Sequence, residues 1–270
     1  DALPILPTRI EFFTKELARE LKNETGGADV IHANNVLAHV ADTNGFVAGI
    51  GHLLKESGAA VIEVPYVKEL IDHCEFDTIY HEHLCYFSVT ALDKLFRRHQ
   101  LYLNHIRKLP IHGGSLRLYV EKREQQSKAA REVLAEERNQ GIDRLAYYAD
   151  FGEKVNRLKE RLNRLLAGLK SGGKRIAAYG AAAKGSTMIN YTGIGTDLID
   201  FVVDRNVHKQ GKYMPGMHIP IEATEALLEK RPDYTLLLAW NFADEIMAQQ
   251  KVYLENGGKF IVPVPEPRII

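Results

Sequence analysis

Residues 175–186 read RIAAYGAAAKGS, a short apolar run that leads through a glycine- and alanine-rich turn into a helical segment. Residues 175–179 have the length and apolar character of a strand buried in a parallel sheet, and helical spacing follows over residues 184–191. The alternation continues toward the C-terminus, with strand-like runs at residues 199–203, 234–239 and 260–264 and helical patterns at residues 222–230 and 243–256. This pattern implies right-handed crossovers and therefore predicts an α/β fold with a doubly wound parallel sheet.

The first part of the chain carries a second strand–helix–strand pattern. Residues 28–33 and 59–64 are short β-branched runs, typical of buried parallel strands, and residues 45–55 between them have apolar side chains at helical spacing. Two more strands are predicted at residues 101–107 and 115–121, on either side of a turn-rich segment. These elements indicate a separate α/β sheet upstream of the doubly wound one.

A polar helical stretch lies between the two sheets. Apolar residues recur at spacings of three and four between residues 151 and 169, which predicts a helix with one apolar face. We favour packing of this helix on its own domain over a coiled-coil dimer, because roughly three heptads is the lower limit for a coiled coil. We therefore expect three segments: an α/β domain over residues 1–122, a helical connector over 123–171 and a Rossmann-like domain over 172–270.

Composition excludes several classes of protein. The 270 residues include 35 Lys and Arg and 35 Asp and Glu, so the formal net charge is zero and gives no support to binding of nucleic acid or an anionic membrane. Cys74 and Cys85 cannot form a disulfide framework, and two cysteines alone cannot close a structural zinc site. No apolar run approaches the roughly 18 residues that span a bilayer, and the first residues are not a signal peptide. We expect a cytoplasmic protein.

Side chains with reactive groups follow the predicted strands, where ligands bind in open α/β sheets. Asn34 and Asn35 follow the first strand. Residues 76–88, FDTIYHEHLCYFS, combine aromatic, imidazole and carboxylate groups at a density that is unusual outside a functional site. A metal held by His81 and His83, with Glu82 or Asp77 added, is disfavoured because no third ligand recurs at a metal-like spacing, so we expect none. Histidines without a chemical role remain the alternative.

The doubly wound part presents a second candidate site. A short glycine- and alanine-rich turn at a helix N-terminus suits a phosphate, although this turn matches neither established phosphate-binding pattern and close helix–strand packing explains its small residues equally well. The glycine, basic and aromatic residues expected at this edge are Gly180, Lys184, Arg205, Lys209, Trp240 and Asn241. Their combination favours a nucleoside diphosphate over an apolar ligand. Arg117, after a Gly-Gly pair, is a further candidate for a carboxylate or phosphate, with a plain hairpin turn as the alternative.

Several sequence blocks, taken in order, carry a family resemblance. They are NNVLAHV at residues 34–40, LLK at 53–55 with VIEVP at 61–65, DTIYHEH at 77–83, HGGSLR at 112–117 and YGAAAKG at 179–185. Together they resemble the S-adenosylmethionine-dependent nucleotide-sugar C-methyltransferases, which add branches to deoxysugars. The similarity continues through residues 204–211 and 238–242, so it covers essentially the whole chain.

The resemblance implies a fold and a set of ligands. It implies a partial class I methyltransferase sheet, which is Rossmann-like, followed by a domain that holds the nucleotide sugar. The implied cofactor is S-adenosylmethionine beside Asn34 and Asn35, and the implied partner is a nucleoside-diphosphate 4-keto-deoxysugar.

The family pattern also implies an active site formed by Tyr80, Glu82, His83 and His39. His83 is the expected base, because an imidazole titrates near neutral pH. We expect Glu82 to orient an imidazole or hold a sugar hydroxyl, and Tyr80 and His39 to donate hydrogen bonds to the oxyanion that forms when a C–H next to a ketone is deprotonated.

Family members begin with a cysteine-ligated zinc module and a glycine-rich first turn, and neither is found in these 270 residues. Residues 3–13 resemble the region of the family's third strand. We therefore expect zinc only in that upstream module, weak binding of the cofactor, an open sheet edge where the strands at residues 28–33 and 59–64 lose a neighbour, and a monomer or weak self-association.

Two other classes of function remain open. One is a dinucleotide-dependent oxidoreductase that uses the sheet of residues 172–270, disfavoured because the glycine fingerprint and an acidic ribose partner are missing. The other is a non-catalytic protein that only binds a nucleotide sugar.

Overall fold

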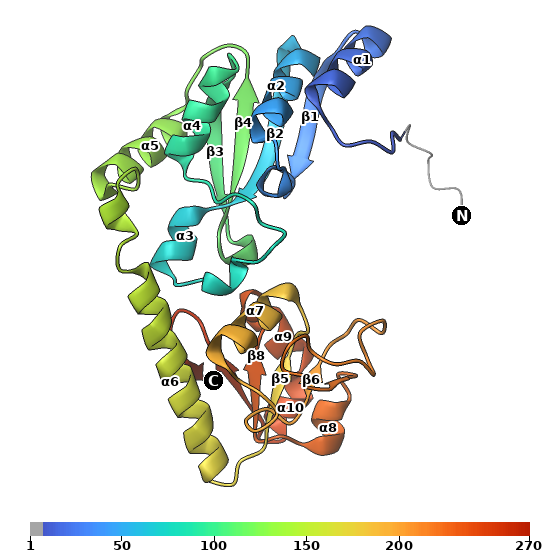
Figure 1. Ribbon diagram of the computed structural model, residues 1–270, viewed down its shortest axis with the longest axis vertical. Coiled ribbons are helices and arrows are strands. Elements are labelled where there is room, and N and C mark those ends of the chain that lie inside the picture. Colours follow the sequence, from blue (N-terminus) through green and yellow to red (C-terminus); the bar gives the residue numbers. More distant parts are fainter. Residues whose placement is uncertain (1–7) are drawn as a thin grey trace. The chain divides into compact units, whose positions relative to one another are not determined.

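The structure is a computed structural model, and it describes residues 8–270 apart from the side chain of His112. The chain forms two compact units, whose elements are labelled in Figure 1. The N-terminal unit contains the residues up to Tyr66 together with Leu84–Pro110 and Ser115–Asp143. The C-terminal unit contains Val67–His83, Ile111–Gly114 and Arg144–Ile270. The chain therefore divides differently from the three expected segments.

The N-terminal unit is built on a four-stranded sheet with the order β1-β2-β4-β3. Strand β1 pairs with β2 in parallel, whereas β4 is antiparallel to both of its neighbours, so β3 runs in the direction of β1 and β2. The strands are β1 (Ala28–Asn34), β2 (Leu54–Pro65), β3 (Tyr102–Leu109) and β4 (Ser115–Glu121). All four predicted strands are confirmed, and β2 is longer at its start because it begins where the preceding helix ends.

In the described residues, the helices α2 (Thr43–Leu53), α4 (Val89–Arg98) and α5 (Lys128–Gln140) pack on this sheet, and α1 (Lys15–Thr25) packs on α2. Each of these helices is preceded by a residue whose side chain accepts a hydrogen bond from the first turn: Thr14 before α1, Asp42 before α2, Ser88 before α4 and Ser127 before α5. Such caps satisfy backbone N–H groups that have no partner within the helix. The core between helices and sheet is apolar, with Ile50, Ile62 and Leu116 fully buried.

Strand β1 is an edge strand in the described part of the chain, as predicted for residues 28–33, whereas β2, which contains residues 59–64, lies between β1 and β4. Val30 on this strand is 65% exposed. Of the segment that resembles the family's third-strand region, residues 3–7 lie outside the described residues. Residues 8–13 form no helix or strand, so a third strand is not seen beside β1 in the range described.

The C-terminal unit contains a six-stranded sheet with the order β10-β9-β8-β5-β6-β7. All neighbours are parallel except the edge strand β10, and the order reverses between β5 and β8. The strands are β5 (Ile176–Tyr179), β6 (Val202–Val203), β7 (Ile221–Glu222), β8 (Tyr234–Leu237), β9 (Lys259–Val262) and β10 (Arg268–Ile269). This topology confirms the predicted doubly wound sheet, and its switch point is where such sheets bind ligands.

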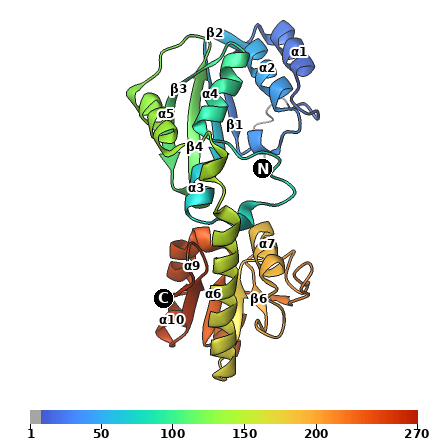
Figure 2. The same ribbon diagram turned by 60° about the vertical axis from the view of Figure 1, so that its left-hand side comes forward.

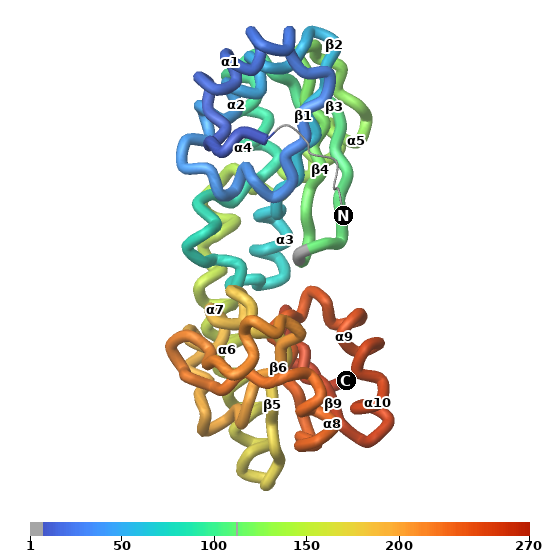
Figure 3. Tube along the Cα trace, turned by 90° about the vertical axis from the view of Figure 1, so that its right-hand side faces the viewer, coloured from blue at the N-terminus to red at the C-terminus, as the bar shows by residue number. Residues whose placement is uncertain are grey.

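Helices cover both faces of this second sheet. Figure 2 shows the long helix α6 in front of the sheet, with α7 on one side and α9 and α10 on the other, and Figure 3 shows α9 and α10 beside β9. The helices are α3 (Val67–Asp72), α6 (Phe151–Ser171), α7 (Ala183–Thr192), α8 (Ala226–Lys230), α9 (Ala243–Gln249) and α10 (Lys251–Glu255). The predicted helix over residues 243–256 is thus two short helices.

Helix α6 explains where the polar middle stretch belongs. Its apolar face, including Val155, Leu158 and Leu162, is buried in the same core as Ile176 and Met188. This confirms packing on its own domain. The expected connector of residues 123–171 is nevertheless divided, because α5 packs with β3 of the N-terminal unit.

Candidate functional site

His83 lies in the C-terminal unit, at the end of a turn that begins with the short 3-10 helix Phe76–Thr78. Its Nδ1 atom is 2.9 Å from the carbonyl oxygen of Thr78, and its Nε2 atom is 3.1 Å from the hydroxyl of Tyr80. Because a carbonyl oxygen can only accept, Nδ1 carries the proton of the neutral ring. Nε2 is therefore the acceptor, and the hydroxyl of Tyr80 donates to it.

Tyr80 is held close against His83. The two ring centroids are 4.3 Å apart, with the planes tilted by 32°. Burial raises the pKa of Tyr80, and the carboxylates of Glu82 and Asp77 raise it further. The phenol consequently stays protonated, so Tyr80 is suited to donate a hydrogen bond and not to act as a base.

Glu82 and His81 lie at the surface beside this pair. Their side chains are 58% and 86% exposed, and Oε1 of Glu82 is 3.9 Å from Nε2 of His81. Both ring nitrogens of His83 are occupied by Thr78 and Tyr80, so the prediction that Glu82 orients an imidazole does not apply to His83. The exposed carboxylate remains available for the other predicted role, a hydrogen bond to a sugar hydroxyl.

The remaining predicted active-site residues belong to the N-terminal unit. Asn34 ends β1, and Asn35 follows with a left-handed φ of 54° while its N–H donates to the carbonyl of Glu63 at 2.9 Å. Within the described part of the chain, the buried Oδ1 atom of Asn35 has no hydrogen-bond partner. A buried acceptor without a partner is costly, so this atom marks a place where a ligand donor fits.

Residues that follow Asn35 in the sequence line a cavity of about 650 Å³. Val36 and His39 line it together with Phe13 and Phe46. The N–H groups of the residues directly after His83 donate to the carbonyl of Ala38, next to His39, at 2.9 and 3.2 Å. The cavity and the orphaned oxygen of Asn35 are compatible with a cofactor that has both an apolar part and hydrogen-bond donors.

The turn before α7 is supported by neighbours in the C-terminal unit. Gly180 has a φ of 101°, and a Cβ atom there would lie 2.8 Å from that of Ala239, so only glycine fits. The N–H of Ala181 donates to Oδ2 of Asp204 at 2.7 Å, and Nζ of Lys209 donates to the carbonyl of Ala181 at 2.7 Å. Lys209 therefore braces the turn.

Asp204 directly follows β6, the second strand of the doubly wound sheet, where nucleotide-binding sheets carry the acidic partner of a ribose. An acidic residue thus stands at this position, and its carboxylate accepts from the N–H of Ala181 and lies 3.6 Å from Nζ of Lys209. The glycine fingerprint remains absent from the turn.

Lys184 is half-buried and lies against two buried acids. Its Nζ atom is 4.7 Å from the centre of the Trp240 ring, on which it stacks as a cation. Burial lowers the pKa of Lys184, while the charges of Asp77 and Glu75 raise it. The indole N–H of Trp240 donates to Oδ2 of Asp77 at 2.7 Å. A phosphate at Lys184 would therefore have to share the ammonium group with two carboxylates.

Glu75 and Asp77 are the buried acids of this network; sequence analysis missed Glu75 and considered Asp77 only as a further ligand of the disfavoured metal site. Burial raises the pKa of Glu75 to about 7 and that of Asp77 to about 6, in each case against the lowering effect of Lys184. The signal was an acidic pair on either side of Phe76, but its burial depends on packing with α7 and Trp240, which are distant in the sequence.

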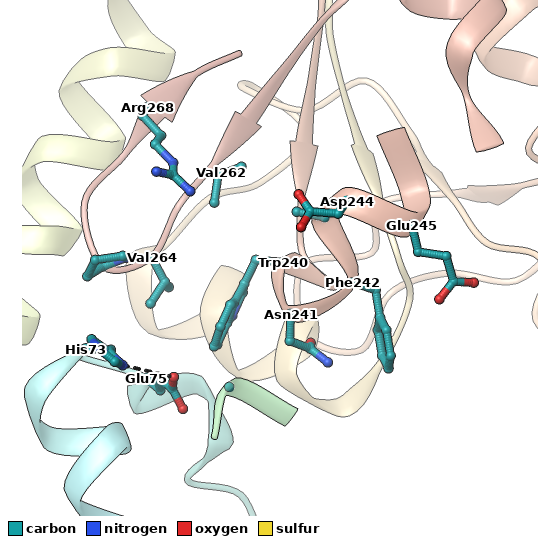
Figure 4. A pocket seen from close by; sticks show the side chains of 13 residues that line it. His73, Glu75, Trp240, Asn241, Phe242, Asp244, Glu245, Val262, Val264 and Arg268 are labelled. Atoms are coloured by element: carbon teal, nitrogen blue, oxygen red, sulfur yellow. Dashed lines mark ion pairs between the residues drawn. The ribbon is translucent and has the colours of Figure 1, made fainter. Parts of the chain in front are cut away.

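A cavity of about 570 Å³ lies beside Trp240, at the carboxyl end of β8 (Figure 4). Figure 4 shows Trp240 in the centre, with His73 and Glu75 to one side and Asn241 to the other. The charged residues of its lining are His73, Glu75, Asp244, Glu245 and Arg268. Carboxylates thus outnumber the arginine, so the cavity suits a ring with hydroxyl or N–H donors better than a phosphate.

The other predicted contacts lie outside this cavity. The Arg205 side chain is 66% exposed and 3.8 Å from Glu245. Arg117 belongs to the N-terminal unit, where its Nε donates to the buried Glu63 on the neighbouring strand at 2.5 Å. Gly113 approaches Glu75 so closely that a Cβ atom would lie 2.4 Å from the carboxylate. The Gly-Gly pair is explained by this packing without a ligand.

The described residues lack two features. No helix of that range is long and apolar enough to cross a membrane. In the same range, no three His, Cys, Asp or Glu side chains gather in a way that could hold a metal ion.

Comparisons with known proteins give consistent matches. Residues 110–265 match the family described as "C-methyltransferase C-terminal domain", and residues 3–106 match "Methyltransferase domain". The C-methyltransferase NovU from Streptomyces niveus is 40% identical over 261 residues, which are 96% of this chain and 62% of NovU. The chain thus spans about three fifths of that relative's length. A solved O-methyltransferase family protein from Burkholderia thailandensis is 17% identical over 41% of this chain and 34% of its own, with a TM-score of 0.28, and carries no argument.

Proposed function

Because the chain belongs to the C-methyltransferase family, we propose that it transfers a methyl group from S-adenosylmethionine to a carbon atom of its substrate. The proposed substrate is a nucleoside-diphosphate 4-keto-deoxysugar, methylated at a ring carbon next to the ketone. The observation that carries the proposal is the His83–Tyr80 pair, in which the carbonyl of Thr78 holds Nδ1 and leaves Nε2 as the basic atom of the neutral imidazole form.

His83 is the proposed base. Its Nε2 atom takes the proton from the carbon next to the ketone, and the electron pair of that C–H bond moves into the enolate. The Nδ1–H bond to Thr78 fixes the tautomer needed for this step. S-adenosylmethionine, when bound, supplies an electrophilic methyl group.

In this scheme the hydroxyl of Tyr80 donates to one of two acceptors, Nε2 of His83 or the ketone oxygen of the substrate. In the ligand-free protein its hydroxyl donates to Nε2 of His83, the same atom that must accept the substrate proton. A ketone oxygen placed near Tyr80 would draw the hydroxyl away and leave Nε2 open. Binding of the substrate would thus both expose the base and give the developing oxyanion a donor, with His39 as the second proposed donor.

The two ligands are assigned to different units. The orphaned Oδ1 of Asn35 and the cavity lined by His39 support the cofactor in the N-terminal unit, with Asn34 next to it. The cavity beside Trp240 and Asn241 supports a base or sugar ring of the nucleotide sugar in the C-terminal unit, whereas its acidic lining does not favour the diphosphate. Gly180, Arg205 and Lys209 remain proposed contacts of this ligand. Arg117 is the least supported contact, because its Nε atom already donates to Glu63.

The proposed base is tested by solvent exchange of the acidic C–H in the protein expressed from its complete gene. We expect His83→Asn to slow both deuterium incorporation into the 4-keto sugar and methyl transfer by about 100-fold or more, with unchanged binding of the nucleotide sugar. His81→Asn, an exposed imidazole two residues away, is the matched control and should remain active.

Two outcomes would count against the proposal. Exchange at the parent rate in His83→Asn would remove His83 as the base. A parent protein that binds the nucleotide sugar but neither exchanges the proton nor transfers methyl would instead favour a non-catalytic binding protein.

A further inference from the structure

We infer that Asp77 is a positioning residue that links the proposed base His83 to the ligand cavity beside Trp240. Neither the family descriptions nor the relatives assign this residue a role. The inference rests on the proposed function of His83, and all of the contacts that carry it lie within the C-terminal unit.

Asp77 lies in the turn that fixes the imidazole of His83. Its neighbour Thr78 provides the carbonyl that accepts the Nδ1–H of His83, and the hydroxyl of Thr78 donates to the carbonyl of Glu75 at 2.8 Å. The local turn therefore holds its own shape. The bond from Trp240 to Asp77 at 2.7 Å joins this turn to the segment that follows β8, 163 residues away in the sequence.

Trp240 carries this link to the cavity. One part of its indole is occupied by the ammonium group of Lys184, and its N–H points to Asp77. The ring also lines the cavity of about 570 Å³, beside Asn241. A ligand ring that packs on Trp240 therefore acts on the group that holds Asp77, and so on the turn that carries the carbonyl of Thr78.

The charge of Asp77 is a second link between this residue and the proposed site. Burial, the charge of Glu82 and the charge of Asp77 all raise the pKa of Tyr80. The other charged groups near Asp77 are Lys184 on α7 and Glu75 at the start of the turn. Removal of the carboxylate would lower the pKa of Tyr80, while burial, the largest cause of the shift, keeps the phenol protonated and able to donate to Nε2 of His83.

The burial of Asp77 indicates a role beyond stability. The side chain is fully buried, and within the described residues its Oδ1 atom has no hydrogen-bond partner. A buried carboxylate with an unsatisfied oxygen lowers stability relative to a well-packed neutral residue. Asp77 therefore lowers the stability of the folded protein, so packing alone does not explain its presence at this position.

The test compares Asp77→Asn with the parent protein. Asparagine keeps an acceptor for Trp240 but removes the charge. Without ligand, we expect a lower pKa of Tyr80 by ¹³C NMR of labelled tyrosine, and a mixture of His83 tautomers by ¹⁵N NMR. In the protein from the complete gene, we expect kcat to fall by about tenfold or more while KM for the nucleotide sugar changes by less than about threefold.

Asp200→Asn is the matched control, since Asp200 is a half-buried carboxylate of the same unit, paired with Lys170 at 2.6 Å. It should leave Tyr80 and His83 unchanged. If Asp77→Asn does not fold, Trp240→Phe removes the N–H donor to Asp77 while it keeps an aromatic ring beside Lys184, and the same change of the His83 tautomer is expected. Parent-like Tyr80 and His83 signals in the variant that folds, or a kcat within about twofold of the parent in Asp77→Asn, would overturn the inference.

The two NMR measurements need no substrate. They test the position of Asp77 even if His83→Asn retains exchange and the proposed function fails.

Discussion

Glu75 shows at the scale of one residue how burial makes stability depend on pH. Its side chain is 5% exposed, and burial raises its pKa from 4.5 to about 7. Between about pH 4.5 and 7 the unfolded carboxyl is ionised while the folded one keeps its proton, so stability falls as pH rises through this range. Asp77 adds a contribution of the same sign at lower pH.

We therefore expect Glu75→Gln to gain stability over the parent as pH rises from about 4.5 to 7, by about 1 to 3 kcal/mol in total. Urea unfolding at pH 5 and pH 8 measures this difference. Glu153→Gln on α6, whose carboxylate is 78% exposed, is the control and should show little change. A stability difference between Glu75→Gln and the parent that does not vary with pH would contradict the assignment.

Single residues also mark the limit of what the sequence could predict about the site. The Tyr80–His83 run was identified because its reactive groups are neighbours in the chain. The network of Asp77, Lys184 and Trp240 was not, because the chain brings these residues together only when α7 and the end of β8 pack against the turn. Lys184 was consequently expected at an open edge, whereas its charge is used inside the unit.

At the scale of elements, Glu137 joins three parts of the N-terminal unit. This carboxylate on α5 is fully buried and accepts from the hydroxyl of Tyr66, just after β2, at 2.8 Å. It also accepts from the N–H groups of Val89 and Thr90 in the first turn of α4, both at 2.7 Å. A negative charge at a helix N-terminus is favourable, and here it satisfies donors that the helix itself leaves unpaired.

We expect Glu137→Gln to lower the free energy of unfolding by about 2 kcal/mol, because an amide replaces one acceptor oxygen with a donor that faces other donors. Glu136→Gln is the control, since Glu136 forms a half-exposed ion pair with Lys108 and should cost less than about 0.5 kcal/mol. Chemical denaturation with an unchanged m-value measures both. Equal effects of the two substitutions would show that Glu137 is no more than a surface charge.

The existence of the elements was predictable and their ends and partners were less so. The strand at residues 115–121 has the predicted bounds because an alternating pattern ends there in a charged turn. The predicted strand at residues 199–203 retains strand pairing only at Val202–Val203, since pairing depends on neighbours that local pattern does not contain. For the same reason the sequence did not show that residues 67–83 pack with the C-terminal unit.

At the scale of the whole molecule, two Rossmann-like α/β units supply different parts of the proposed reaction. The order β10-β9-β8-β5-β6-β7 confirms the doubly wound prediction, and the four-stranded sheet with its edge at β1 agrees with a partial methyltransferase sheet. The cytoplasmic location, the weak cofactor binding and the monomeric or weakly associated state stay predictions. They depend on the environment of the chain, which its own packing does not determine.

The central claim is that the protein methylates carbon, and the most direct measurement is the position of a labelled methyl group. The protein from the complete gene is incubated with S-adenosylmethionine carrying a ¹³C-methyl group and with a nucleoside-diphosphate 4-keto-deoxysugar, and the product is examined by NMR. We predict that the label appears on the ring carbon next to the ketone and that His83→Asn removes this signal. A label on oxygen, or no transfer from a protein that binds both compounds, would contradict the account.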